Sequence, residues 1–315
     1  MGLFDKFTDS VFIKDDDTLE RRLSKLNNIR NRVQEKEQIA REIKLLSYGI
    51  KGEKNIEFEL KNANIGLYIL HDVNIEYDDL KAQIDYIIIS PAYIYLVECK
   101  NLIGNVTVDS KGEFRREYVL NDKKIKEAIY SPYTQALRHK DILKKIWISK
   151  HNKLERLLFE KNFDSTYRPL IVLANSKGIL NIRYAPKDIR NCTIRVDQLV
   201  NYIKTDINRA SKDSLRSQKA MLEVANSLLS KCVDVKNDPA LKYTFIDIKD
   251  KLKEYRLAKA KKHNIPAYYI FTDEELDKML TQNIETFDQL VASKILSDVK
   301  LKFHGREIID IINNK

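Results

Sequence analysis

Three runs rich in Ile, Val and Tyr follow one another at residues 67–73, 83–90 and 93–99, with only short turn segments between them. These residue types favour β-strands, and the pairs Asp78-Asp79 and Ser90-Pro91 are typical of the turns that join neighbouring strands. We therefore expect strands that pair within one sheet, and the chain must fold around it.

Helical patterns flank these strands. Apolar residues recur at steps of three and four from 17 to 48, and Asp15 to Thr18 fit the start of that helix. Gly49 and Gly52 are expected to interrupt it before a second helix over 53–61. Further elements are predicted as a hairpin at 104–118, strands at 168–174 and 192–196, and helices at 132–147, from 197 and at 211–232. This order predicts a mixed α/β domain.

The turn-forming sequence Asn237-Asp238-Pro239 is the best candidate for a domain boundary, because it separates two helical patterns. The sequence after it is almost wholly helix-like and is the size of one small bundle. We predict an N-terminal helical extension at 1–48, an α/β domain with trailing helices at 49–236 and a helical domain at 241–315.

Composition excludes several classes of protein. With 43% hydrophobic residues among 315 and only 8 Gly and 6 Pro, the chain can bury real cores and is neither collagen-like nor disordered. No apolar stretch is long enough for a membrane helix or a secretory signal, so we expect a cytoplasmic protein without a membrane partner. The spacing of Cys99, Cys192 and Cys232 favours buried thiols over a zinc site. The net charge of +10 favours a polyanionic partner, and the oligomeric state is not indicated.

The most informative residues are Asp85, Glu98 and Lys100. Because strand side chains alternate, Glu98 and Lys100 project from one face, and a tight antiparallel connection brings Asp85 beside Glu98. Two carboxylates so close repel each other unless a cation lies between them. A divalent cation so held would suit phosphodiester hydrolysis, with the lysine orienting or deprotonating a water molecule. The alternative is a surface salt bridge between Glu98 and Lys100.

Several motifs in order resemble the NERD (nuclease-related domain) family, which is similar to the PD-(D/E)xK nucleases. The resemblance covers roughly residues 49–204 and rests on Gly52-Glu53, Gln83-Ile84-Asp85, Val97-Glu98-Cys99-Lys100-Asn101 with Gly104, Ser131-Pro132-Tyr133-Thr134-Gln135 and Ile194-Arg195-Val196-Asp197-Gln198-Leu199. It implies that Asp85 and Glu98 bind Mg²⁺ or Mn²⁺, that Lys100 is catalytic, and that Glu53 completes the metal site. It also implies a mixed-sheet nuclease-like core.

Glu53 and Gln135 each have a second interpretation. Glu53 and Glu57 stand four residues apart on one helix face, where a cation would relieve their repulsion, or where both are simply solvated. Gln135 begins a Gln-x-x-x-His pattern that resembles the Gln-x-x-x-Tyr element of RecB-like nucleases, with His139 in place of tyrosine. That pattern favours contact with nucleic acid near the cleavage site, or a solvated polar helix face.

The C-terminal segment carries a basic helix and a second resemblance. Seven basic residues lie between Ile248 and Lys262, and a stripe of this kind neutralises phosphates or remains solvated. Thr272 and Glu275 have the spacing of a capping box. The segment looks like an HRDC (helicase and RNase D C-terminal) domain, on Leu252 to Ala260, Ile265-Pro266-Ala267-Tyr268-Tyr269-Ile270-Phe271-Thr272-Asp273, Leu276, Leu290, Lys300 and Gly305. The segment 295–299 lacks the glycine that such domains often carry before the lysine, which makes docking to a protein partner more plausible.

Together these observations predict a metal-dependent nuclease that hydrolyses phosphodiester bonds, with DNA as the favoured substrate and the C-terminal bundle helping to hold it. The alternative is a non-catalytic nucleic-acid-binding or adaptor protein that keeps the nuclease fold. The intact set of Asp85, Glu98 and Lys100 favours the enzyme.

Overall fold

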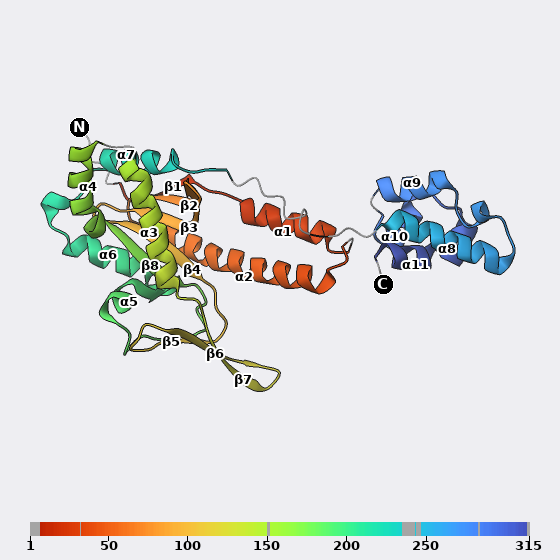
Figure 1. The fold of residues 1–315 in the computed structure, drawn as a ribbon, viewed down its shortest axis with the longest axis horizontal. Coiled ribbons are helices and arrows are strands. Elements are labelled where there is room, and N and C mark those ends of the chain that lie inside the picture. Colours follow the sequence, from red (N-terminus) through yellow and green to blue (C-terminus); the bar gives the residue numbers. More distant parts are fainter. Residues whose placement is uncertain are drawn as a thin grey trace. The chain divides into compact units, whose positions relative to one another are not determined.

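The computed structural model describes residues 7–31, 33–149, 152–234, 243, 247–282 and 284–313 (Figure 1). The strands are β1 (Ser10–Lys14), β2 (Leu67–Tyr77), β3 (Leu80–Ile89), β4 (Ile94–Lys100), β5 (Asn105–Val108), β6 (Phe114–Leu120), β7 (Lys123–Ala128), β8 (Tyr167–Leu173), β9 (Leu180–Asn181) and β10 (Thr193–Arg195). The main helices are α1 (Thr18–Ile29), α2 (Lys36–Lys61), α3 (Pro132–Ser149), α4 (Lys153–Thr166), α5 (Lys187–Cys192), α6 (Leu199–Arg209), α7 (Gln218–Leu229), α8 (Ile248–His263), α9 (Asp273–Thr281), α10 (Phe287–Ser293) and α11 (Asp298–Ile312).

The chain forms two compact units, each described by itself. The first comprises the described residues within 1–20 and 45–237, and the second those within 21–44 and 238–315. The segment predicted as an N-terminal extension is therefore divided between the two units. The predicted boundary at Asn237-Asp238-Pro239 lies outside the described residues.

A six-stranded sheet with the order β1-β2-β3-β4-β8-β10 forms the centre of the first unit. Strand β3 pairs antiparallel with both β2 and β4, as the sequence predicts. Strand β8 pairs in parallel with both β4 and β10. This mixed sheet, with helices against it, confirms the predicted α/β class.

Helices cover both faces of this sheet (Figure 1). On one face, α3 and α7 contribute residues such as Leu143 and Met221 to a core with Ile87 and Leu96. On the other face, Ile56 of α2 and residues of α6 pack against the strands. The alternating strand side chains thus fill two separate cores, which is why these strands read as nearly continuous apolar runs.

Two features of the N-terminal segment differ from the prediction. Residues 10–14 form the edge strand β1, parallel to β2, so the segment is not wholly helical. Helix α2 runs without a break through Gly49 and Gly52, where an interruption was expected. Glycine weakens a helix by only about 1 kcal/mol, and the packing of α2 against the sheet outweighs that cost.

A second, four-stranded sheet has the order β7-β6-β5-β9. Its β5–β6 pair is the predicted hairpin, with Gly112 at a φ of +81° in the turn. The following β6–β7 hairpin was not predicted, and Asn121 and Asp122 form its turn with positive φ values of 50° and 59°. All three cysteines are free thiols.

The second unit is helical, as predicted. Helices α8 to α11 surround a core that includes Leu252, Phe271 and Ile308. The Thr272 hydroxyl accepts from the backbone N–H of Glu275, and the Glu275 carboxylate accepts from the backbone N–H of Thr272, which confirms the predicted capping box. Among the described residues, no helix is long and apolar enough to cross a membrane.

Candidate active site

The site begins where the pairing of β3 and β4 ends. The last residues in register are Tyr86 and Val97, so Asp85 and Glu98 come next on their strands. Asp85 Oδ2 accepts a hydrogen bond of 2.7 Å from the backbone N–H of Cys99. The carboxylate of Asp85 therefore takes the place of a backbone acceptor at this point of the ladder. This is the juxtaposition of two carboxylates that the sequence predicts.

A local distortion of β2 lies opposite Asp85. Asp72 has a φ of +51°, and the side-chain alternation of β2 shifts there, because Leu70 and Val73 pack in the same core. The buried carboxylate of Asp72 accepts hydrogen bonds from Gln83 Nε2 at 2.7 Å and from the Asn74 side chain. Gln83, part of the motif that carries the family resemblance, thus supports the backbone beside the candidate site.

Glu98 and Lys100 face α3 from the same side of β4. Lys100 Nζ donates to Glu98 Oε1 at 2.6 Å and to Gln135 Oε1 at 3.1 Å. The Glu98–Lys100 ion pair of the alternative interpretation therefore exists, but it is not a surface pair, since only 2% of the Glu98 side chain is exposed. Gln135, whose role was open, reaches the lysine of the site.

The second carboxylate oxygen of Glu98 has no hydrogen-bond partner among the described residues. His139 Nδ1 lies 3.6 Å away. Burial and the positive charge of Lys100 lower the pKa of His139 to about 4, so this imidazole is neutral near pH 7 and cannot balance the carboxylate. A buried carboxylate oxygen without a donor is costly, and a cation would satisfy it.

Charge repulsion within the site is strong. Burial, and then the charges of Glu98 and Glu53, raise the pKa of Asp85 well above its usual 3.8. Burial also raises the pKa of Glu98, against the opposing effect of Lys100. Neighbouring like charges with raised pKa values cost stability, so a chain keeps them mainly where they serve a function.

Glu53 lies near the site because α2 approaches β4 closely at Gly52. A Cβ at Gly52 would lie 2.6 Å from the Cβ of Asn101 and 3.2 Å from the sulfur of Cys99. Asn101 also donates to the backbone carbonyl of Tyr48 at 2.7 Å. The glycine before Glu53 is therefore a packing requirement that sets where the helix carries its carboxylate.

Replacing Gly52 by alanine should destabilise the protein by about 1–3 kcal/mol, because two Cβ atoms cannot share this space and α2 must shift. Gly49 provides a matched control on the same helix, since a Cβ there meets nothing within 4 Å. Gly49→Ala should stabilise by roughly 0.5–1 kcal/mol through helix propensity. Chemical denaturation measures both variants. Equal effects of the two substitutions would contradict the packing argument.

The carboxylate of Glu53 pairs with His71, a residue that no motif in the sequence predicts to be at the site. His71 Nε2 lies 2.8 Å from Glu53 Oε2 and its ring stacks on Tyr86. Burial lowers the pKa of His71, but the hydrogen bond and charge of Glu53 outweigh it, and the net shift is upward. Tyr86 in turn donates to the backbone carbonyl of Glu53 at 3.0 Å. The sequence signal that could have predicted this role is a single histidine within the apolar run of β2.

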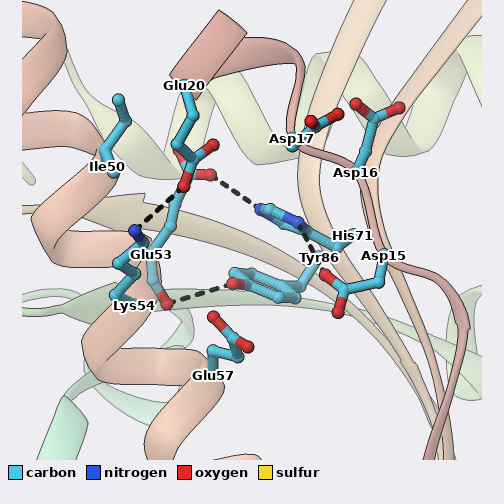
Figure 2. A pocket seen from close by; sticks show the side chains of 10 residues that line it. All are labelled: Asp15, Asp16, Asp17, Glu20, Ile50, Glu53, Lys54, Glu57, His71 and Tyr86. Atoms are coloured by element: carbon cyan, nitrogen blue, oxygen red, sulfur yellow. Dashed lines mark hydrogen bonds and ion pairs between the residues drawn. The ribbon is translucent and has the colours of Figure 1, made fainter.

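Figure 2 shows the cavity on the His71 side of Glu53. It has a volume of about 340 Å³ and six carboxylates line it, against one lysine and His71. Lys54 pairs with Glu20 at 3.2 Å across this cavity. The carboxylates are those of Asp15, Asp16, Asp17, Glu20, Glu53 and Glu57. We name it the acidic cavity. Glu57 also forms an ion pair with Lys61, so its charge is partly balanced.

The donors fit a hard divalent cation in part. Asp85 and Glu98 offer carboxylate oxygens, including the orphaned oxygen of Glu98. Among the described residues, no three His, Cys, Asp or Glu side chains are grouped so as to hold a metal ion, so the predicted set with Glu53 is not assembled. Mg²⁺ commonly takes one or two protein carboxylates together with waters and substrate phosphates. Asp85 and Glu98 satisfy that smaller requirement.

The charge of the basic helix α8 is partly balanced by acidic residues of its own unit. Lys249, Arg256 and Lys259 pair with Asp277, Asp273 and Glu307 at 2.7–2.8 Å. Three other lysines have no ion-pair partner among the described residues: Lys253, Lys261 and Lys262. Lys300 on α11, part of the HRDC resemblance, pairs with Glu275 at 2.7 Å. The free charge of this helix is therefore smaller than its sequence suggests.

Comparison with known protein families finds a match for one segment in each unit of the chain. Residues 48–174 match the family model of the nuclease-related domain, and residues 247–312 match that of the HRDC domain. No curated protein and no solved structure matches the chain. The first match contains Glu53, Asp85, Glu98, Lys100 and Gln135. The chain thus joins a nuclease-related domain of the NERD family to a C-terminal HRDC domain.

Proposed function

We propose that this protein is a metal-dependent nuclease that hydrolyses phosphodiester bonds, with DNA as the favoured substrate. The observation that carries the proposal is the buried carboxylate of Glu98, which has one oxygen on Lys100 and one without a partner, beside the half-buried Asp85. A structural ion pair does not need a second carboxylate next to it. In a domain of the nuclease-related family, this arrangement is the expected place for phosphodiester chemistry.

Each residue has a distinct task in this proposal. Asp85 and Glu98 would hold Mg²⁺ or Mn²⁺, which activates a water molecule and offsets charge on the scissile phosphate when bound. Lys100 would orient the attacking water and stabilise the charge that develops on phosphate oxygens. Gln135 accepts from Lys100 and keeps the ammonium group directed at the site. The carboxylate of Glu53 adds negative charge next to Asp85 and so favours a bound cation.

The direct test is incubation of the purified protein with supercoiled, linear and single-stranded DNA and with RNA. Each substrate is offered with magnesium, with manganese and with chelator. We expect cleavage of DNA that depends on the metal and stops with chelator. Absence of cleavage on all substrates with both metals would refute the nuclease proposal.

The second candidate is a non-catalytic nucleic-acid-binding or adaptor protein. The pairing of Glu53 with His71 favours it, because a third carboxylate then does not join Asp85 and Glu98. Calorimetric titration with magnesium or manganese separates the two candidates. Binding that Asp85→Asn abolishes supports the enzyme, and absence of heat in the wild type supports the adaptor.

The role of the HRDC domain in holding DNA is a separate part of the proposal and has its own test. If α8 contacts phosphates, replacing Lys253, Lys261 and Lys262 by alanine should flatten the salt dependence of DNA binding by about 3 in log–log slope, since each lost contact removes about 0.9. Lys249→Ala is the control, because Lys249 is committed to Asp277. Fluorescence anisotropy over a salt series measures the slope. An unchanged slope would indicate that the domain docks to a protein instead.

A further inference from the structure

A second cavity lies next to the candidate site, on the side of α3. Its volume is about 690 Å³, and its lining includes Gln135 and His139. Gln135 accepts a hydrogen bond from Lys100 and His139 lies 3.6 Å from Glu98, so these two side chains separate the cavity from the candidate reacting groups by one layer of residues. We name it the α3 cavity. Its size suits a nucleotide or a drug-sized ligand, which occupy pockets of roughly 300–1,000 Å³.

The charge of the α3 cavity is opposite to that of the acidic cavity. Lys81, Arg138 and Lys145 line it, against the single carboxylate of Asp141. Lys145 pairs with Asp141 at 2.9 Å and Lys81 pairs with a neighbouring glutamate, but Arg138 has no ion-pair partner among the described residues. Arg138 therefore attracts a phosphate group to the α3 cavity, whereas the acidic cavity, where six carboxylates are only partly balanced by neighbouring cations, disfavours it (Figure 2).

An aromatic side chain stands beside the unpaired charge. Tyr130 lines the α3 cavity with 58% of its surface exposed, and the guanidinium of Arg138 lies over its ring, 5.6 Å from the centroid. An exposed aromatic face beside a cation is the arrangement on which nucleobases stack while the cation meets the backbone. In paired duplex DNA, base faces are covered by their neighbours, so only an unpaired or displaced base offers its face.

We propose that the α3 cavity binds an unpaired nucleotide of the strand to be cut, with its base against Tyr130 and its phosphate at Arg138. The inference rests on the proposed function and narrows its substrate to strands with an unpaired nucleotide next to the scissile bond, such as single strands or frayed ends. The acidic cavity excludes the same strand from the other side.

The test measures binding in the presence of chelator, so that cleavage does not interfere. The probes are a fluorescein-labelled single-stranded oligonucleotide and a blunt duplex of the same sequence. Tyr130→Ala should weaken binding of the single strand by about 5- to 150-fold, the usual range for loss of one stacked base. Binding of the duplex should change far less. Tyr130→Phe keeps the aromatic face and should bind like the wild type.

Tyr184 provides a matched control, because it is 69% exposed and has the guanidinium of Arg183 over its ring at the same 5.6 Å, outside the α3 cavity. Tyr184→Ala should leave binding unchanged. Thermal unfolding verifies that both variants fold. Unchanged single-strand binding in Tyr130→Ala, or equal loss on the single strand and the duplex, would overturn the inference.

Failure of this inference and failure of the nuclease proposal can be told apart. A protein that cuts no nucleic acid with either metal, yet loses single-strand binding in Tyr130→Ala, refutes the nuclease and supports the cavity. A protein that cuts normally, with Tyr130→Ala indistinguishable from the wild type on single strands, supports the nuclease and refutes the cavity.

Discussion

Asp85→Asn is expected to reduce metal-dependent cleavage by about 10³-fold or more, because several kcal/mol of transition-state stabilisation depend on the ligand charge and each 1.36 kcal/mol is tenfold in rate. The metal-free variant should unfold at the same temperature as the wild type or higher. Burial and the charges of Glu98 and Glu53 disfavour the Asp85 carboxylate, and asparagine removes that repulsion. Its side-chain oxygen still accepts from the Cys99 N–H.

Thermal unfolding with and without metal checks this prediction together with the cleavage assay. Magnesium or manganese should raise the unfolding temperature of the wild type and not that of Asp85→Asn, since a ligand stabilises the state that binds it. Glu98→Gln should behave alike in cleavage, and exposed Asp213→Asn serves as the control. Cleavage by either site variant at the wild-type rate would show that the assigned site is wrong.

Lys100→Ala is expected to slow cleavage by about 10²–10³-fold at saturating metal, the cost of losing one group that stabilises developing charge. Metal affinity should stay the same or increase, because the ammonium group repels a cation held by Glu98. The metal-free variant should be less stable, since Glu98 then has no hydrogen-bond donor on either oxygen. Added metal should restore that stability.

Single-turnover cleavage and calorimetric titration separate these effects for Lys100. Lys100→Arg retains the charge but not the compact ammonium group, and it should recover stability more than turnover. Weakened metal binding with normal turnover at saturating metal would contradict the assigned role.

The pairing of the central strands could be predicted because it depends on local sequence. Short turns at 78–79 and 90–92 leave antiparallel pairing as the simplest connection, and register then places Asp85 beside Glu98. The strand β1 was missed because its partner β2 lies more than fifty residues away in the chain. The continuity of α2 was missed because the helix is stabilised by contacts with the sheet, which no local pattern reports.

The parts of the site that escaped prediction come from tertiary contacts. His71 meets Glu53 only because α2 packs over β2, and their separation in sequence carries no periodic signal. The balance of charge on α8 likewise depends on acidic residues of α9 and α11. A basic stripe in a sequence therefore gives an upper limit on the charge available to a partner.

The position of β4 between β3 and β8 has a consequence for motion. Residues 94–97 of β4 are bonded along both edges and open only when the sheet itself opens, and Glu98 continues this strand in register with Ile171 of β8. The candidate reacting groups at its end are therefore fixed in place before any substrate arrives. Side chains of α3 and the exposed Tyr130 move on a much faster timescale, so we expect them to make any adjustment to a bound nucleic-acid strand.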